Sequence, residues 1–180
     1  MPFENSKDAL VEGRWLDALG GGDPRALGGL FEIYGERIFR FSYRILGNRT
    51  EAEDVTAETF LRVMRRSGDL RADGAFRTWI FRIARNLCID RMRQQRLVEL
   101  PADARYAGPE EGTALRVTVQ RALAELPVEY REPLVLCDLE EMPAREAAEV
   151  LKLSVPALKS RLYRGRRALR DKLAGVLDSL

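Results

Sequence analysis

One stretch of the sequence decides how the chain folds: residues 143–173 read PAREAAEVLKLSVPALKSRLYRGRRALRDKL. The pattern predicts a short helix over 143–151, a break at Lys152-Leu153-Ser154, and a second helix with Pro156 in its opening turn. A helix pair with this spacing has the proportions of a helix-turn-helix, whose second helix enters the major groove of DNA. The stretch therefore predicts helical structure with a nucleic-acid-binding unit.

The second predicted helix has an apolar side and a basic side. Four leucines at helical spacing are expected to pack: Leu158, Leu162, Leu169 and Leu173. The residues expected to face DNA are Pro156, Ala157, Lys159, Ser160, Tyr163, Arg164 and Arg167. Arginine can hold guanine or phosphate through two parallel hydrogen bonds, and lysine can hold phosphate as a point charge. The alternative is an amphipathic helix docked on another protein, for which the same apolar stripe would serve.

The helical period extends over almost the whole chain, and no segment shows the sustained alternation that is typical of strands. Residues 99–113 are rich in proline and glycine and poor in apolar groups, which is the composition of a linker. The sequence thus predicts an all-α fold of two small helical domains joined by a flexible linker. The predicted organisation is an N-terminal segment at 1–26, a first domain at 27–98, the linker at 99–114 and a helix-turn-helix domain at 115–180.

Capping signals place two helices before residue 67. Asp23-Pro24 predicts the start of the first helix, and Gly47-Asn48 predicts its end. Thr50 and Glu53 have the spacing of a capping box, which predicts the start of the next helix.

A third helix is predicted from about residue 76 to 96, after a loop of turn-forming residues at 67–74. One side of this helix is expected to pack and consists of Phe76, Ile80, Ile83, Ala84 and Leu87. The other side is expected to meet solvent or a partner and carries Thr78, Arg82, Arg85, Asn86 and Arg93.

Charge is distributed in blocks, although the 30 basic and 28 acidic residues nearly cancel. The net charge is about −4 over residues 1–59, about +7 over 60–98, about −7 over 99–151 and about +7 over 152–173. Two separate basic blocks suggest two contacts with a polyanion, whereas the acidic blocks suggest a basic protein partner or simple solubility. The alternative for each basic block is a solvated helix face.

The composition also excludes several kinds of site. The chain has no histidine, and its two cysteines, Cys88 and Cys137, lie in apolar runs, where we expect buried structural thiols. Zinc sites built from histidine and cysteine and histidine-dependent catalysis are excluded within the monomer. We therefore expect no enzyme, no metal, no cofactor and no small-molecule substrate. No apolar run approaches the ~20 residues needed to cross a bilayer and no leader pattern is visible, so we expect a cytoplasmic protein.

Several strings resemble the extracytoplasmic-function (ECF) sigma factors of the bacterial primary-type sigma family. In the C-terminal half these are Leu126-Pro127, Tyr130-Arg131, Leu134-Val135-Leu136, Leu139-Glu140, Ala147-Ala148-Glu149-Val150-Leu151, Lys159-Ser160-Arg161-Leu162 and Arg164-Gly165-Arg166. They are similar to the domain that reads the −35 promoter element. The resemblance implies that the seven DNA-facing residues given above, from Pro156 to Arg167, contact this element.

The N-terminal half resembles the same family independently. The run from Ala52 to Leu61 is similar to the segment that docks on the coiled coil of the polymerase β′ subunit, which implies polymerase contacts at Asp54, Val55, Glu58, Phe60 and Leu61. The run from Phe76 to Arg91 is similar to the helix that handles the −10 element. The residues implied there, including three from the preceding loop, are Asp69, Leu70, Arg71, Arg82, Arg85, Asn86, Asp90 and Arg93.

The resemblance implies a sigma factor that directs promoter-specific transcription and helps to melt the −10 region. Its implied partners are core RNA polymerase, through the β′ coiled coil and the β flap, promoter DNA in duplex and single-stranded form, and a cognate anti-sigma factor, which could hold the chain at the membrane. A stand-alone helix-turn-helix regulator is the main alternative, and it would bind DNA tightly without polymerase. A scaffold with idle basic faces, or an enzyme that uses surface carboxylates alone, fits the residues less well.

Overall fold

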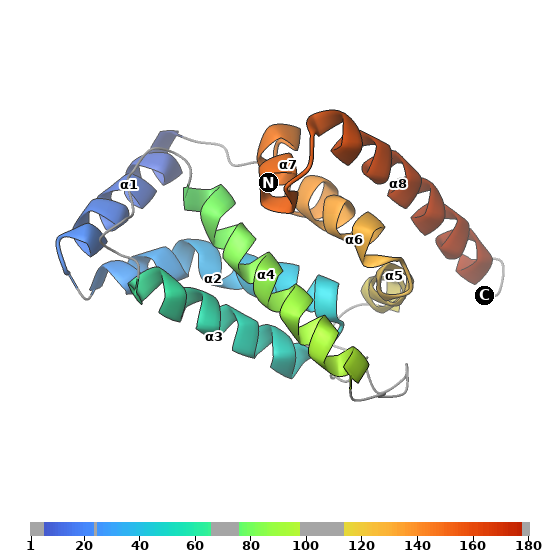
Figure 1. Ribbon diagram of the computed structural model, residues 1–180, viewed down its shortest axis with the longest axis horizontal. Coiled ribbons are helices and arrows are strands. Elements are labelled where there is room, and N and C mark those ends of the chain that lie inside the picture. The colour runs from blue at the N-terminus through green and yellow to red at the C-terminus, as the bar shows by residue number, and fades with distance from the viewer. Residues whose placement is uncertain (1–5, 24, 66–75, 98–113, 178–180) are drawn as a thin grey trace.

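The computed structural model describes residues 6–23, 25–65, 76–97 and 114–177, and it is helical with no strand in those ranges. The first four helices are α1 (Ser6–Gly20), α2 (Arg25–Leu46), α3 (Arg49–Arg65) and α4 (Phe76–Leu97). They are followed by α5 (Ala114–Ala124), α6 (Val128–Leu134), the π-helical segment η3 (Val135–Leu139), α7 (Ala144–Leu151) and α8 (Val155–Leu177). Figure 1 shows α1–α4 on one side and α5–α8 on the other. The all-α prediction is confirmed.

The N-terminal domain, α1–α4, is built around α2, which packs against the other three helices. Tyr34 and Phe41 of α2 are fully buried, and their rings meet Phe76 and Phe81 of α4 edge to face. A helix, α2, does begin after Asp23-Pro24 as predicted, but it is not the first helix, because α1 precedes it.

Helix α1 docks closely on α2. Leu16 and Leu19 are buried, and a Cβ atom added to Gly29 would lie 2.2 Å from the Trp15 indole. Only glycine therefore leaves room for the Trp15 ring at this crossing.

Three helix ends were predicted from capping residues, at Asp23, at Gly47 and at Thr50, and the structure agrees with the first two. The Asp23 carboxylate accepts the backbone N–H of Arg25 at 2.9 Å, and Gly47 ends α2 with φ 71°. The capping box predicted for Thr50 and Glu53 is wrong, because Asn48 caps α3 by accepting the Glu51 backbone N–H at 3.0 Å. Glu53 instead accepts a hydrogen bond from the side chain of Arg49.

The C-terminal domain, α5–α8, packs α8 against α5, α6 and α7. Helix α6 is followed directly by η3, and α6 contains Pro133, which cannot donate the backbone hydrogen bond of an ordinary helical residue. Leu123, Leu126, Leu134 and Leu162 form a buried cluster between these helices.

The two domains pack directly on each other. The main cluster of buried apolar residues continues from α1–α4 into the C-terminal domain, where it includes Val135, Leu136 and Leu158. Helix α4 contacts α7 as well as α2 and α3, so it lies between the two sets of helices. Thr78 and Phe81, which were not predicted to pack, are buried, and the Phe81 ring packs against Phe41 of α2. The predicted loop at 67–74 and residues 99–113 of the predicted linker lie outside the described residues, and Ala114 begins α5. None of the described helices is long and apolar enough to cross a membrane.

Candidate nucleic-acid and protein interfaces

Helices α7 and α8 form the predicted helix-turn-helix. Lys152 adopts a left-handed conformation with φ 55°, and the Leu153 N–H donates to the Ala148 carbonyl at 2.9 Å, which closes the turn after α7. The Ser154 hydroxyl then accepts the Ala157 N–H at 3.3 Å at the start of α8. Leu158 is fully buried, so the apolar side of α8 is fixed against α7 and the core.

The outward side of α8 carries the residues that the sequence assigned to DNA. All are exposed except Ala157, which is half-buried, and they are Pro156, Ala157, Lys159, Ser160, Tyr163, Arg164 and Arg167. The Tyr163 side chain is 70% exposed, which is unusual for an aromatic residue in a helix with a well-packed inner side. Lys159, Arg164 and Arg167 make no ion pair with any residue that the structure describes. Three unpaired cations and a projecting ring on one helix face suit a polyanion.

Two neighbouring residues on α8 make contacts within the protein. Arg166 turns back to η3 and donates two hydrogen bonds to the Asp138 carboxylate, at 2.9 and 2.6 Å. A Cβ atom added to Gly165 would lie 3.0 Å from the Tyr130 carbonyl oxygen, so α6 and α8 approach closely at this point.

The residues predicted on α4 are divided between solvent and the C-terminal domain. Asn86, Asp90 and Arg93 are exposed, and Asp90 lies 3.9 Å from Arg93. Arg82 is half-buried, and its Nε atom has no hydrogen-bond partner among the described residues. Arg85 is bound by Glu132 of α6 in a two-pronged salt bridge with distances of 2.7 and 3.3 Å. The predicted Asp69, Leu70 and Arg71 lie outside the described residues.

The residues predicted on α3 also separate into two layers. Asp54 and Leu61 are exposed and Glu58 is half-buried, whereas Val55 and Phe60 are buried in the core and support α3 from below. A hydrogen bond from Arg62 at 2.9 Å holds the pKa of Glu58 below its usual value, so this carboxylate is charged at neutral pH.

Two exposed apolar residues near this surface were missed by the sequence reasoning. The side chain of Met64 is 47% exposed and that of Phe31 is 51% exposed, and the Phe31 ring contacts Phe60 at a centroid distance of 4.9 Å. Phe31 follows the apolar period of α2, so periodicity alone does not show that its side chain is exposed.

The match to known protein families agrees with this geometry. Residues 30–98 match the family model for sigma-70 region 2, and residues 116–169 match the model for sigma-70 region 4. ECF RNA polymerase sigma factor SigW of Bacillus subtilis is 34% identical over 171 residues, which cover 84% of this chain and 91% of SigW. The chain belongs to the ECF RNA polymerase sigma factors.

A second relative supports the ECF assignment in sequence and structure. RNA polymerase sigma factor CnrH of Cupriavidus metallidurans is 31% identical over 175 residues, which cover 88% of this chain and 90% of CnrH. The structure of CnrH in complex with the cytosolic domain of CnrY is similar with a TM-score of 0.71 and 28% identity, and the match covers 94% of this chain and 98% of that one. As an ECF sigma factor, the chain binds core RNA polymerase and directs promoter-specific transcription initiation, and its family is not one of enzymes.

The two thiols of this ECF sigma factor are free and at least partly withdrawn from solvent. Cys88 is fully buried, as predicted, and Cys137 is only half-buried. Burial raises the pKa of Cys88 to about 12 and that of Cys137 to about 11, so both thiols are protonated at neutral pH.

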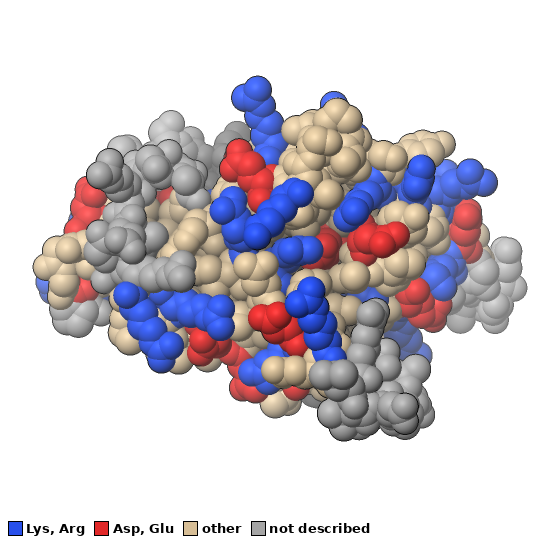
Figure 2. Space-filling model, viewed as in Figure 1, with Lys and Arg blue, Asp and Glu red and all other residues tan. Residues whose placement is uncertain are grey.

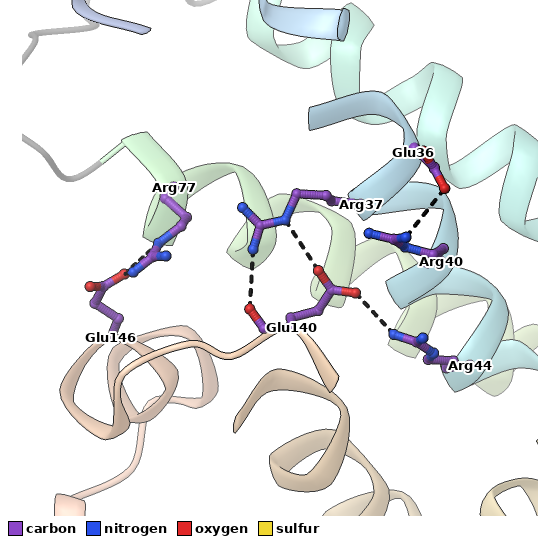
Figure 3. A network of polar contacts seen from close by, with 7 residues as sticks. All are labelled: Glu36, Arg37, Arg40, Arg44, Arg77, Glu140 and Glu146. Atoms are coloured by element: carbon purple, nitrogen blue, oxygen red, sulfur yellow. Dashed lines mark hydrogen bonds and ion pairs between the residues drawn. The ribbon is translucent and has the colours of Figure 1, made fainter. Parts of the chain in front are cut away.

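The ECF sigma factor also has an interdomain set of charges that sequence reasoning missed. Glu140 lies between two α2 arginines, with Oε–N distances of 3.2 Å to Arg37 and 3.0 Å to Arg44, while Arg77 pairs with Glu146 of α7 (Figure 3). Figure 2 shows basic and acidic side chains interleaved on this face rather than one continuous basic surface. The alternation of charged blocks was the only sequence feature that pointed to these ion pairs, and it does not specify which residues pair.

Proposed function

We propose that the outward face of α8 reads the −35 element of the promoter. The observation that carries this proposal is the absence of described ion-pair partners for the exposed Lys159, Arg164 and Arg167, beside the projecting Tyr163 ring. Arginine can donate two hydrogen bonds to guanine in the major groove, and the second helix of a helix-turn-helix is the one that reaches it. Ser160 and the first turn at Pro156 and Ala157 complete this surface.

We further propose that α4 and residues 69–71 contact the −10 element. Asn86 can read a base edge, and Arg82, Arg85 and Arg93 can hold a single-stranded backbone. Asp90 can accept from a cytosine amino group or orient Arg93. Residues 27–98 and 115–180 then act as separate promoter-binding domains, and residues 99–114 connect them.

The surface of α3 is proposed to bind the β′ coiled coil of core polymerase. Asp54 and Glu58 supply negative charge beside the exposed Leu61, and a mixed acidic and apolar surface suits a basic coiled coil. Val55 and Phe60 act from beneath by fixing the position of α3. The β flap is proposed as a second polymerase contact, made by the C-terminal domain on the strength of the family resemblance.

An anti-sigma factor is a further proposed partner. CnrH was solved in complex with the cytosolic domain of CnrY, and this chain is similar to CnrH over nearly its whole length. We infer that a comparable partner binds this chain and could hold an otherwise cytoplasmic protein at the membrane. The proposed function requires no cofactor and no small-molecule substrate.

The −35 assignment can be tested by transcription with purified core RNA polymerase and promoter fragments selected by the wild-type chain. Arg164→Ala is expected to lower output from −35-dependent promoters by roughly 5- to 150-fold, because a lost base contact is worth about 1–3 kcal/mol. Arg170→Ala, an exposed arginine of the same helix outside the proposed surface, is the control and should retain output. Equal output from both variants would remove Arg164 from the −35 contact. A chain that ignored core polymerase but bound duplex DNA alone would support the stand-alone regulator instead.

A further inference from the structure

The turn of the helix-turn-helix holds a lysine in a backbone conformation that favours glycine. Lys152 follows α7 with φ 55° and ψ 45°, which is the left-handed helical region. Its N–H donates to the Glu149 carbonyl at 3.2 Å, and the Leu153 N–H donates to the Ala148 carbonyl at 2.9 Å. These two hydrogen bonds form a Schellman motif. Its left-handed position is usually glycine, because a Cβ atom there is crowded by the backbone.

The packing on either side of Lys152 imposes this conformation. Leu151 before it is buried, and Leu153 after it packs against the main cluster of buried apolar residues. The chain must therefore reverse its direction between two anchored residues. Lys152 itself is exposed. The turn thus fixes the backbone of Lys152 and leaves its side chain free to differ from lysine.

A role within the protein does not account for the lysine side chain. A cation at the end of a helix is attracted to the helix dipole, but this effect is smaller than the cost of the left-handed conformation for a residue with a Cβ atom. The carbonyls of Ala148 and Glu149 already accept backbone N–H groups. Lys152 makes no ion pair with any residue that the structure describes, although Glu149 lies three positions before it. Its ammonium group is therefore available to a partner.

The position of Lys152 suits a contact with a DNA phosphate. In a helix-turn-helix complex the first helix crosses the DNA backbone and the second enters the major groove, so the turn between them passes from the backbone to the groove. Lys152 lies in that turn, between α7 and the first residue of α8, Val155 (Figure 1). Lysine binds phosphate as a point charge on a flexible side chain, so the contact needs no fixed side-chain geometry.

We propose that Lys152 binds a phosphate group beside the −35 element, and that this lysine is kept in a left-handed turn, at a cost in stability, because its charge contributes to DNA binding. The proposal rests on the proposed role of α8 in reading the −35 element. A phosphate contact strengthens binding and helps to fix the register of α8 on the duplex, but it selects no base. Base selection remains with Arg164 and its neighbours on α8.

Three substitutions separate the charge of Lys152 from its backbone conformation. Lys152→Gly removes both the charge and the backbone strain. Lys152→Asn removes the charge and keeps a residue that tolerates the left-handed region, whereas Lys152→Arg keeps the charge. Lys172→Asn is the control, because it makes the same chemical change about 25 Å from the start of α8, at a lysine that binds Glu125.

Thermal unfolding followed by circular dichroism tests the cost in stability. Lys152→Gly is expected to raise the Tm by about 2–4 °C, because glycine adopts the left-handed conformation without strain. A Tm below that of wild type would show that the lysine stabilises the turn, and the proposal would be wrong.

Binding of the assembled holoenzyme to a fluorescein-labelled promoter fragment tests the contact. Each full-length chain is combined with core polymerase and titrated at about 0.1 M and about 0.2 M salt, on a fragment selected by the wild-type chain. Losing one phosphate contact reduces the salt slope by about 0.9, which gives roughly 8-fold weaker binding at 0.1 M and roughly 4-fold weaker binding at 0.2 M, if the contact contributes nothing at 1 M. Lys152→Gly and Lys152→Asn should show this loss, whereas Lys152→Arg and Lys172→Asn should bind like wild type. The same loss is expected on a fragment with an altered −35 sequence, because phosphates carry no sequence information.

Wild-type affinity of Lys152→Asn at both salt concentrations would refute the phosphate contact. A loss confined to the selected −35 sequence would also refute it, since that result indicates a base contact. Arg164→Ala in the same assay tests the underlying −35 assignment. If Arg164→Ala binds the selected fragment like wild type, the assignment of α8 fails; if it binds weakly while Lys152→Asn does not, the assignment stands and only the role of Lys152 fails.

Discussion

The side chain of Arg131 joins the C-terminal ends of two helices, α5 and α2, and replacing it should lower stability more than replacing any surface arginine would. Its guanidinium donates to the carbonyl of Ala124 at the end of α5, to that of Leu126 just after α5 and to that of Ile45 near the end of α2, and the residue is 7% exposed. Arg131→Met preserves much of the apolar volume and leaves three acceptors without this donor.

The expected magnitude follows from two opposing effects. Hydrogen bonds from a charged donor contribute about 1.5–3 kcal/mol each, so three contribute roughly 5–9 kcal/mol. Burial lowers the pKa of Arg131 from 12.5 to about 10, which means that keeping its charge in the folded state costs about 3 kcal/mol. The hydrogen bonds prevail, and Arg131→Met should lose at least about 2 kcal/mol.

Thermal unfolding followed by circular dichroism measures this loss. For a chain of this size each kcal/mol lowers the Tm by about 2–4 °C, so we expect a decrease of at least about 4 °C. Arg145→Met, at an exposed position of α7, is the control and should stay within about 2 °C of wild type. If the Tm of Arg131→Met also stays within about 2 °C of wild type, the three hydrogen bonds do not stabilise the fold and the argument from capped helix ends is wrong.

Three further predictions concern other parts of the molecule. Asp54→Arg should weaken co-elution with core polymerase without lowering the Tm, whereas Asp17→Arg on α1 should not, and unchanged co-elution would remove Asp54 from the interface. Glu12→Gln should raise the Tm at pH 7. Burial raises the pKa of Glu12, so the carboxylate destabilises the fold once the pH is above that pKa, whereas the neutral glutamine does not. The advantage should vanish below about pH 4.5, where glutamate is protonated in both states, and a Tm difference independent of pH would contradict this. Gly165→Val should lower the Tm by several degrees, because even a Cβ atom there lies 3.0 Å from a backbone oxygen of α6, and an unchanged Tm would show that the two helices can move apart.

Local patterns were sufficient for much of the fold. The helix from 76 to 96 and the pair around Ser154 were predicted because long apolar periods and capping residues act within one or two turns. Helix α1 was missed because its docking depends on the notch at Gly29, which is distant in sequence from Trp15. The capping of α3 was misassigned because Asn48 and Thr50 are both suitable caps, and only the backbone geometry selects Asn48.

The candidate sites were predictable to the extent that they depend on one helix. The outward face of α8 follows directly from helical spacing, so its residues are exposed together. The pairing of Arg85 with Glu132 joins positions 47 residues apart and depends on how two domains meet, which no local pattern specifies. The burial of Val55 and Phe60 likewise depends on the packing of α3 against its neighbours.

The alternation of charge along the chain corresponds to ion pairs between distant segments of the folded structure. A sigma factor needs basic surfaces for promoter DNA, but such surfaces also attract any other nucleic acid, because phosphate contacts carry no sequence information. Glu132 lies opposite Arg85 and Glu140 lies between two α2 arginines, so these arginines are paired within the chain. Arg164 and Arg167 of α8, by contrast, are exposed and have no ion-pair partner among the described residues, so within the described structure their charges are left for a polyanionic partner.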